Sequence, residues 1–241
     1  MSIRNWAIHW LRACGLMACI SRFHQAFLNM LKWACRLTGR SHMDVIYNEG
    51  YFAAEEEWTE PSAQEVVKII IDALHPASVV DVGCGSAVYL RFFKQAGLDI
   101  HGYDGSPAAL RRAQVEQHHL QHYDLTKPLR ADRTFDLAIC FEVAEHLPHA
   151  ASPVLVKSLI GLAPCVLFSA AQPGQGGVDH INEKPCEFWV EQFHAAGCRK
   201  DEAMTAQLRV AMGRQGSVWW LEKNLMVFRQ TTATTIATGR A

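Results

Sequence analysis

The stretch that decides the fold is Val79-Val80-Asp81-Val82-Gly83-Cys84-Gly85-Ser86-Ala87. Its mostly apolar first half predicts a buried strand, and the glycines directly after it predict a tight turn. Gly83 and Gly85 lack a Cβ, so the backbone can take conformations that a side chain would block, and a ligand can approach the main chain. A helix is expected just after the turn, with its N-terminus facing that ligand. The segment therefore predicts a strand–turn–helix unit with a ligand site at the carboxyl end of the strand.

Short apolar runs alternate with helical patterns over residues 78–229. Strands are predicted at Val79–Val82, Asp99–Tyr103, Leu120–Tyr123, Phe135–Phe141, Val166–Ser169 and Leu225–Phe228. Alternation of this kind is typical of a mostly parallel sheet with helices on both faces. The fold class expected is thus α/β, a doubly wound sheet of the Rossmann-like type, preceded by a helical extension.

Three acidic residues accompany the predicted strands. Asp81 lies two residues before the first glycine, Asp104 ends the next strand about 20 residues on, and Asp124 follows a third, short strand. A carboxylate at the end of the second strand commonly accepts the ribose hydroxyls of a nucleotide cofactor. Asp124 has a simpler interpretation as a residue that caps a turn. The three acids favour a nucleotide cofactor at this edge of the sheet.

Four segments resemble, in the correct order, the sequence motifs of class I S-adenosylmethionine-dependent methyltransferases. They are Asp81–Ser86, Gly102–Pro107, His122–Leu125 and Phe135–Pro148. The resemblance covers roughly residues 78–230, and its last segment is similar to the quinone-biosynthesis and small-molecule branches. One departure is Ala87, which stands where the family often has a third glycine.

The resemblance implies S-adenosylmethionine as the cofactor and a role for each matching residue. Gly83, Cys84 and Gly85 would line the methionine part through their main chain, with Asp81 near its amino group. Asp104, with Gly105 beside it, would receive the ribose. Asp124 would meet the adenine amine, and Leu125 would lie beside the ring. Phe141 and Glu142 would close the site near the sulfonium.

Two histidines at the same edge are candidate catalytic residues. His146 follows the fourth strand, and His180 lies in the glycine-containing segment Gly174–Pro185 after the fifth. Three glycines could make this segment a mobile lid, and a histidine there could act as a general base near neutral pH. The alternative is structural: His146 would bond a carbonyl or cap a helix, and His180 and Asn182 would fix their own loop.

No metal or disulfide framework is predicted. The eight cysteines include no Cys-x-x-Cys pair, and several lie within apolar runs, so we interpret them as reduced thiols. His180, Asn182 and Glu183 offer too few ligands of the right kind to predict a metal. A net charge of −1 gives no indication of a nucleic-acid partner.

Residues 1–43 form a distinct basic segment. They contain no acid, and their cations are Arg4, Arg12, Arg22, Lys32, Arg36 and Arg40. Helical spacing places most of these on one narrow polar face, with Trp, Phe, Leu and Met on the rest. Two interpretations stay open: an amphipathic helix that lies on a membrane surface, or one that packs on the domain, a partner or a second copy of the chain.

The sequence thus predicts an extension over residues 1–43, a methyltransferase domain over 44–230 and a disordered tail over 231–241. Within the domain, residues 44–77 are expected to hold a connector and then a helix that Pro61 opens and Pro76 ends. We expect a cytoplasmic enzyme, in contact with a membrane if residues 1–43 bind one, that methylates a small molecule, with hydroxyl acceptors favoured. The alternatives are an N-methyltransferase of a small amine and a non-catalytic cofactor-binding scaffold. A nicotinamide-dependent oxidoreductase is disfavoured, because Gly83–Val88 lacks the third glycine of its fingerprint.

Overall fold

The structure is a computed structural model that describes residues 30, 45–214 and 219–231. Seven strands form one sheet: β1 (Ser78–Val82), β2 (Asp99–Asp104), β3 (Leu120–His122), β4 (Leu137–Phe141), β5 (Cys165–Ser169), β6 (Cys198–Lys200) and β7 (Met226–Gln230). The longer helices are α4 (Glu49–Leu74), α5 (Val88–Gln95), α7 (Ser152–Leu162), α8 (Cys186–Ala195) and α9 (Glu202–Arg214), with short α6 (Pro107–Arg111) and α10 (Trp219–Asn224).

The strand order is β3-β2-β1-β4-β5-β7-β6. The first five strands in this order pair in parallel, whereas β7 runs antiparallel to both β5 and β6. The order reverses at β1 and β4, and ligands of such sheets bind at this point, outside the carboxyl ends of the strands. The predicted fold class is therefore confirmed, and the six predicted strands are present. The short strand β6 was missed, because two of its three residues are charged and it does not form an apolar run.

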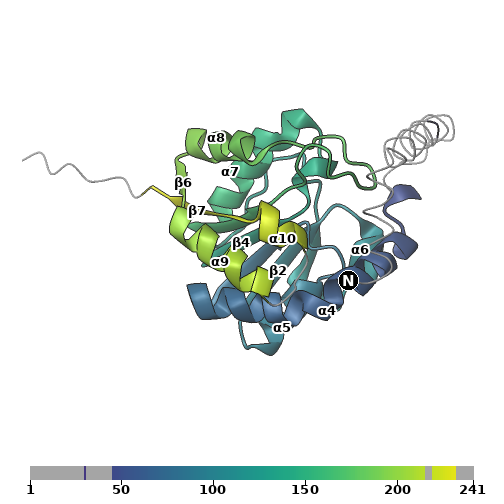
Figure 1. The fold of residues 1–241 in the computed structure, drawn as a ribbon. Coiled ribbons are helices and arrows are strands. Elements are labelled where there is room, and N and C mark those ends of the chain that lie inside the picture. The colour runs from purple at the N-terminus through teal and green to yellow at the C-terminus, as the bar shows by residue number, and fades with distance from the viewer. Residues whose placement is uncertain (1–29, 31–44, 215–218, 232–241) are drawn as a thin grey trace, which may run out of the picture.

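Helices cover both faces of the sheet, so side chains from each strand alternate between two cores (Figure 1). One core packs α7 and α8 against residues such as Val80 and Cys140. The other packs α4, α5 and α9 against residues such as Val79 and Ile139. Burial on both faces explains why the strands appear in the sequence as continuous apolar runs.

Helix α4 corrects one prediction. Pro61 does not open this helix but lies in its interior, and the helix begins twelve residues earlier, at Glu49. The side chain of Asn48 caps it by accepting hydrogen bonds from the backbone N–H groups of Gly50 and Tyr51. Proline removes one backbone hydrogen bond from a helix interior. Here tertiary contacts of the first half, including the buried Phe52, hold the helix on both sides of that position.

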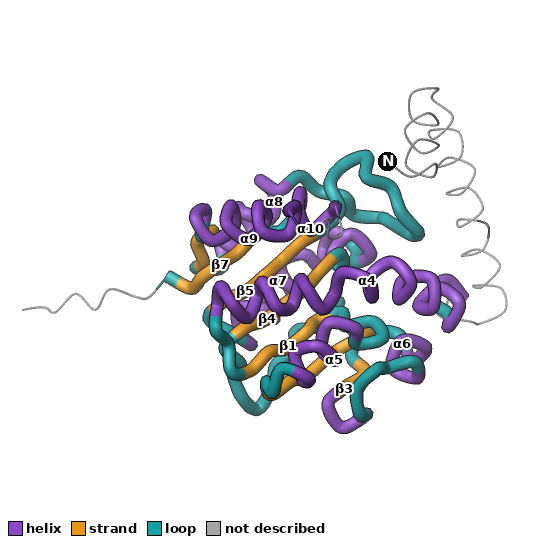
Figure 2. The backbone as a smooth tube through the Cα atoms, turned by 60° about the horizontal axis from the view of Figure 1, so that its bottom comes forward, coloured by secondary structure: helices purple, strands orange, loops and turns teal. Residues whose placement is uncertain are grey.

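The long α4 lies across the sheet and reaches beyond its carboxyl edge (Figure 2). Its second half packs on the core through Val66, Val67 and Ile70. Its first half approaches α6 and the glycine turn, where ion pairs hold it. The guanidinium of Arg112 donates to both oxygens of Glu56 at 3.0 and 2.7 Å, and Arg91 pairs with Glu60. The first half of α4 therefore forms a wall of the region where a ligand is expected.

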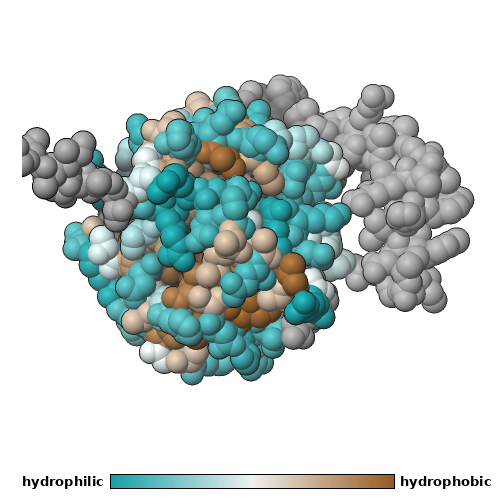
Figure 3. Space-filling view, turned by 60° about the vertical axis from the view of Figure 1, so that its left-hand side comes forward, coloured by the Kyte–Doolittle hydropathy of each residue, from teal (hydrophilic) through white to brown (hydrophobic). Residues whose placement is uncertain are grey.

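Three predictions lie wholly or mainly outside the described residues: the amphipathic helix of residues 1–43, the boundary at 43/44 and the tail of 231–241. In the part of the chain that the structure describes, no helix is both long and apolar enough to cross a membrane. Figure 3 shows a surface on which apolar side chains are interspersed with polar ones. The large apolar side chains exposed in the described residues are Met30, Trp58, Ile181, Val210 and Trp219.

Candidate active site at the carboxyl edge of the sheet

The glycine turn after β1 has the geometry that its sequence predicts. Gly83 and Gly85 have φ of +86° and +53°, in the left-handed region that glycine adopts without strain. A Cβ on Gly83 would lie 2.3 Å from a methyl of Val143, and both Gly83 and Cys84 donate backbone hydrogen bonds to the carbonyl of Tyr103. Ala87, in place of the family's third glycine, also has a positive φ of 62°. The chain thus keeps the backbone shape of a three-glycine turn although one glycine is replaced.

Asp104 joins this turn to the end of β2. Its Oδ2 accepts a hydrogen bond from the backbone N–H of Gly85 at 2.8 Å, and its Oδ1 accepts one from Ser106 at 2.7 Å. The side chain is buried, and burial raises the pKa of this carboxyl, although the two N–H donors act in the opposite direction. Each oxygen keeps acceptor capacity for a ligand hydroxyl. Asp104 can therefore accept further hydrogen bonds at the end of β2, and its contact with a ribose stays a prediction.

Asp81 and Gly83 line a narrow cleft over the turn. Residues from four elements form its walls: Glu55, Glu56 and Thr59 from α4, the turn from Asp81 to Ser86, Val88 and Tyr89 from α5, and Phe141 from β4. Asp81 is buried, and its pKa is raised by burial and by the neighbouring Asp104 and Glu55. Helix α4 was not among the predicted site elements. Nothing local in its sequence indicates that it crosses the glycine turn.

S-adenosylmethionine fits this cleft chemically. Its methionine part carries an ammonium, a sulfonium and one carboxylate and is therefore positive overall, and among the described residues the cleft is lined by acids and by no Lys, Arg or His. The enclosed volume is about 50 Å³, well below the roughly 300 Å³ or more of a typical small-molecule site.

The third motif lies differently from the first two. Asp124 is exposed, and its Oδ1 accepts hydrogen bonds from the backbone N–H and hydroxyl of Thr126, at 3.0 and 2.6 Å, while Lys127 lies 3.3 Å from its other oxygen. Leu125 is buried in the core beside Tyr103. Both therefore have a structural role in this turn, and contact of either with adenine stays a prediction. Gly105 accepts a hydrogen bond at its carbonyl from the ring of His122 (3.0 Å).

Phe141 and Glu142 end β4 beside the cleft. Phe141 packs edge-on against Tyr89, with ring centroids 5.4 Å apart, and lines the cleft directly. Glu142 has φ of +53°, an uncommon conformation for a non-glycine residue that is often found at functional sites. Its carboxylate accepts hydrogen bonds from the side chains of Gln175 (2.7 Å) and the buried Asn224 (3.2 Å). Neither amide was singled out by the sequence, since they lie 33 and 82 residues from Glu142.

The two candidate histidines are neighbours, although 34 positions separate them. Their rings are edge-on with centroids 4.9 Å apart. His146 Nδ1 forms a hydrogen bond with the hydroxyl of Tyr47 at 2.9 Å. Burial, with a smaller effect of His180, lowers the pKa of His146 to about 3. His146 is therefore neutral at physiological pH and held in place, as the structural alternative requires.

His180 has a different environment. Its Nδ1 lies 2.9 Å from Oε1 of Glu183, and the same carboxylate accepts the backbone N–H groups of Gly174 and Gly176, both at 2.8 Å. A Cβ on Gly177 would lie 2.1 Å from His180 Nε2, so the ring packs directly on that glycine. The loop is thus folded around Glu183. The lid motion expected from its glycines requires these bonds to break.

Asn182 fixes the far end of this loop. It is buried, and its amide donates to the carbonyl of Ala144 at 3.2 Å and to the hydroxyl of Ser152 at 3.1 Å. The backbone N–H groups of Ile181 and Asn182 both donate to the carbonyl of Glu145. The loop-fixing role foreseen for Asn182 is what the structure shows.

One group of side chains has the composition of a metal site. The ligand atoms of Glu145, His146 and His180 all lie within 4.8 Å of one another. Hydrogen bonds with Tyr47 and Glu183 already occupy a nitrogen of each histidine, and one oxygen of Glu145 accepts the backbone N–H of Ala171 at 3.1 Å. We assign no metal-dependent step to this group.

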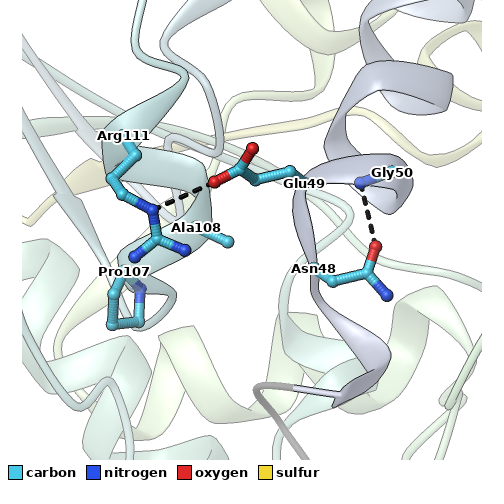
Figure 4. A pocket seen from close by; sticks show the side chains of 6 residues that line it. All are labelled: Asn48, Glu49, Gly50, Pro107, Ala108 and Arg111. Carbon is cyan, nitrogen blue, oxygen red and sulfur yellow. Dashed lines mark hydrogen bonds and ion pairs between the residues drawn. The ribbon is translucent and has the colours of Figure 1, made fainter.

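A second and larger cavity, of about 630 Å³, lies away from the glycine turn. Figure 4 shows the start of α4 on one side and α6 on the other, with an ion pair of 3.1 Å between Glu49 and Arg111 reaching across. The six lining residues are Asn48, Glu49, Gly50, Pro107, Ala108 and Arg111. Of these residues only Pro107 belongs to a motif, and none lies in the glycine turn. We therefore propose the smaller cleft as the cofactor site.

The fold and the site together define a Rossmann-like protein with an acidic cleft between the β1 turn, the end of β2 and α4. Residues 57–171 match the family model described as a methyltransferase domain. This match identifies residues 57–171 as a methyltransferase domain of the class I type, which uses S-adenosylmethionine as its cofactor.

Similar proteins extend this comparison. A malonyl-[acyl-carrier protein] O-methyltransferase of Pseudescherichia vulneris is 42% identical over 66 residues, which are 26% of this chain and 26% of that protein. A ubiquinone biosynthesis O-methyltransferase of Ralstonia nicotianae is 35% identical over 85 residues, 32% of this chain and 35% of that protein. The aligned segments thus span only about a quarter to a third of these relatives. Among solved structures, DesVI of Streptomyces venezuelae has a TM-score of 0.57 at 16% identity, covering 79% of this chain and 99% of that one.

Proposed function

We propose that this protein transfers the methyl group of S-adenosylmethionine to a hydroxyl of a small-molecule acceptor. The observation that carries the choice of a hydroxyl is the pairing of His180 Nδ1 with Glu183. A carboxylate on one nitrogen fixes the ring and leaves the other nitrogen free to act as a base. The two curated relatives are both named as O-methyltransferases, which supports the same choice.

The cofactor half of the mechanism follows from the glycine turn. The backbone of Gly83, Cys84 and Gly85 would hold the methionine part, and the carboxylate of Asp104 would accept hydrogen bonds from the ribose hydroxyls. Phe141 and Glu142 border the sulfonium, while Asp124 and Leu125 face the adenine if the third motif acts as the family resemblance implies. Methyl transfer is an in-line displacement, so these contacts act by holding the reacting carbon in place and excluding water. The cofactor supplies the activated methyl group.

The acceptor half assigns different roles to the two histidines. His180 would take the proton from the acceptor hydroxyl while the acceptor oxygen bonds to the methyl carbon, the carbon–sulfur bond breaks and S-adenosylhomocysteine leaves. His146, neutral and bonded to Tyr47, positions the ring of His180. Because Gly177 packs on His180 Nε2, the acceptor reaches this nitrogen only when the loop of residues 174–180 moves.

The test is methyl transfer from radiolabelled S-adenosylmethionine to a panel of phenols, carboxylic acids, aliphatic alcohols and amines. We expect transfer to an oxygen acceptor, and we expect His180→Asn to lower kcat by about 10² or more, the scale of lost general-base catalysis, with cofactor affinity unchanged. Transfer to amines alone, undiminished in His180→Asn, would favour an N-methyltransferase, because a neutral amine needs no base. Cofactor binding without turnover on any acceptor would favour a scaffold role.

Residues 1–43 suggest that the acceptor is lipophilic and presented at a membrane surface. The support is the sequence alone: a basic polar face with tryptophan, phenylalanine and leucine around it. Flotation with vesicles that contain anionic lipid should retain the full chain but not a chain that starts at His42. Equal flotation of both, or of neither, would contradict this proposal and leave a role in packing or dimerisation.

A further inference from the structure

One acid in the cleft has no hydrogen-bond or ion-pair partner among the residues that the structure describes. Of the acids that line the cleft, Glu56 is paired with Arg112 by two hydrogen bonds. Glu55, the next residue of α4, has neither a hydrogen bond nor an ion pair with any of the described residues. Glu55 is a solvent-exposed residue, and its side chain lines the cleft.

The side chain of Glu55 lies next to the glycine turn that is proposed to bind the cofactor. A Cβ built on Gly85 would lie 3.6 Å from Oε2 of Glu55, and 3.7 Å from the ring of Phe52 one turn earlier. Gly85 is the residue whose N–H bonds Asp104. The carboxylate of Glu55 is therefore in contact distance of the second glycine of the turn.

We propose that Glu55 binds the α-ammonium group of S-adenosylmethionine, so that helix α4 itself carries a cofactor contact and closes on the methionine part. This inference rests on the proposed function. A primary ammonium has three N–H donors and forms strong charge-assisted hydrogen bonds with carboxylates, whereas a sulfonium has no N–H to donate. Asp81, below the turn, approaches the same end of the cofactor from the sheet.

The charges around Glu55 support a cationic partner. The groups that face it are Asp81 and Asp104 from the strands, Glu56 and Tyr51 on its own helix, Tyr47 before the helix and Tyr89 on α5. All are acids or phenols. Burial in the cleft wall, then Asp104 and Glu56, raise the pKa of Glu55 to about 7. An ammonium beside it lowers that pKa, so cofactor binding near pH 7 releases a proton from Glu55.

The deciding experiment compares Glu55→Gln with Glu57→Gln in the full chain. Glu57 lies on the same helix, is exposed and does not line the cleft, so its variant controls for loss of a charge on α4. Binding is measured by calorimetry with three probes. S-adenosylmethionine has both cations, S-adenosylhomocysteine keeps the ammonium but lacks the sulfonium, and 5′-methylthioadenosine lacks the amino-acid part.

We expect Glu55→Gln to weaken the binding of S-adenosylmethionine and S-adenosylhomocysteine by about tenfold to a hundredfold, the scale of a hydrogen bond between charged groups. Methylthioadenosine should bind as it does to the unchanged protein, and Glu57→Gln should bind all three normally. The proton release at pH 7, measured in buffers of different ionisation heat, should disappear in Glu55→Gln alone.

Three results would overturn the inference. Undiminished binding of S-adenosylmethionine by Glu55→Gln would show that Glu55 makes no contact. If the binding of S-adenosylmethionine weakened but that of S-adenosylhomocysteine did not, the carboxylate of Glu55 would be assigned to the sulfonium. An equal loss of methylthioadenosine would show that the substitution disturbs α4 itself. If the unchanged protein bound none of the probes, the proposed function would fail first, which is a distinguishable outcome.

Discussion

A Cβ on Gly83 would lie 2.3 Å from Cγ2 of Val143, the second residue after β4. The glycine turn is thus packed from below by the segment that leads to the candidate histidines. Glycine is required at position 83 for two reasons: φ is +86° there, and the neighbouring segment lies too close for a methyl group.

We expect Gly83→Ala to destabilise the protein by about 3 kcal/mol or more, combining the cost of a left-handed alanine with that of an overpacked contact. Gly97→Ala is a matched control, because Gly97 has φ of +87° and no atom within 4 Å of its built Cβ. Gly97→Ala should lower the free energy of unfolding by only about 1–2 kcal/mol. The measurement is urea unfolding. Adding Val143→Ala should recover part of the loss at Gly83, and no recovery would show that packing is not the cause.

Asp104 and Asp124 should behave differently when each is replaced by alanine. Asp104→Ala is expected to weaken S-adenosylmethionine binding by about 1–3 kcal/mol, the scale for hydrogen bonds to a charged group. Asp124→Ala removes the bonds to Thr126 and should lower stability by about 1 kcal/mol. Calorimetric titration of both variants separates the two roles. A large loss of affinity in Asp124→Ala would establish the adenine contact, and unchanged affinity in Asp104→Ala would place the ribose elsewhere.

Gly177→Ala should displace the His180 ring, because the added Cβ would lie 2.1 Å from Nε2. We expect a fall in kcat of about tenfold or more, in line with the sensitivity of catalysis to small misplacements, and an unchanged Kd for S-adenosylmethionine. Gly174→Ala adds a methyl to the same loop with nothing within 4 Å, and tests backbone strain alone, since φ is +85° there. Equal losses in the two variants would contradict a specific role for the ring of His180.

His146 should make the protein less stable in acid. Its folded-state pKa of about 3 lies below the ordinary value of 6.5, so below pH 6.5 the unfolded chain binds a proton that the folded chain does not. The stability of the folded state therefore falls as the pH drops from 6.5 towards 3, with a slope of at most about 1.4 kcal/mol per pH unit. His146→Asn, which keeps an acceptor for Tyr47, should lack this part of the slope.

The other groups with shifted pKa values, such as Glu55, are shared by both proteins and largely cancel in that difference. The measurement is urea unfolding of both proteins at pH 7 and pH 5, where the destabilisation of the unchanged protein should be greater by up to about 2 kcal/mol. An identical pH dependence of the two would mean that His146 is protonated in the folded state.

The sequence by itself determined the α/β fold, the strands of the parallel core and the acids that follow them. These features are local. An apolar run, a glycine turn and a carboxylate each occupy a few consecutive residues, and parallel strands bring their carboxyl ends to one edge whatever the details of packing. Asp81, Gly83, Gly85 and Asp104 could therefore be named in advance.

Only the tertiary structure decided what lies across that edge. The side-by-side placement of His146 and His180, the amide of Asn224 on Glu142 and the position of Glu55 over Gly85 join residues that are far apart in the chain. The sequence misled at Pro61, because the local preference for ending a helix was outweighed by packing on both sides of it. Contacts of this kind depend on how the helices pack on the sheet, and a short stretch of sequence does not predict that packing.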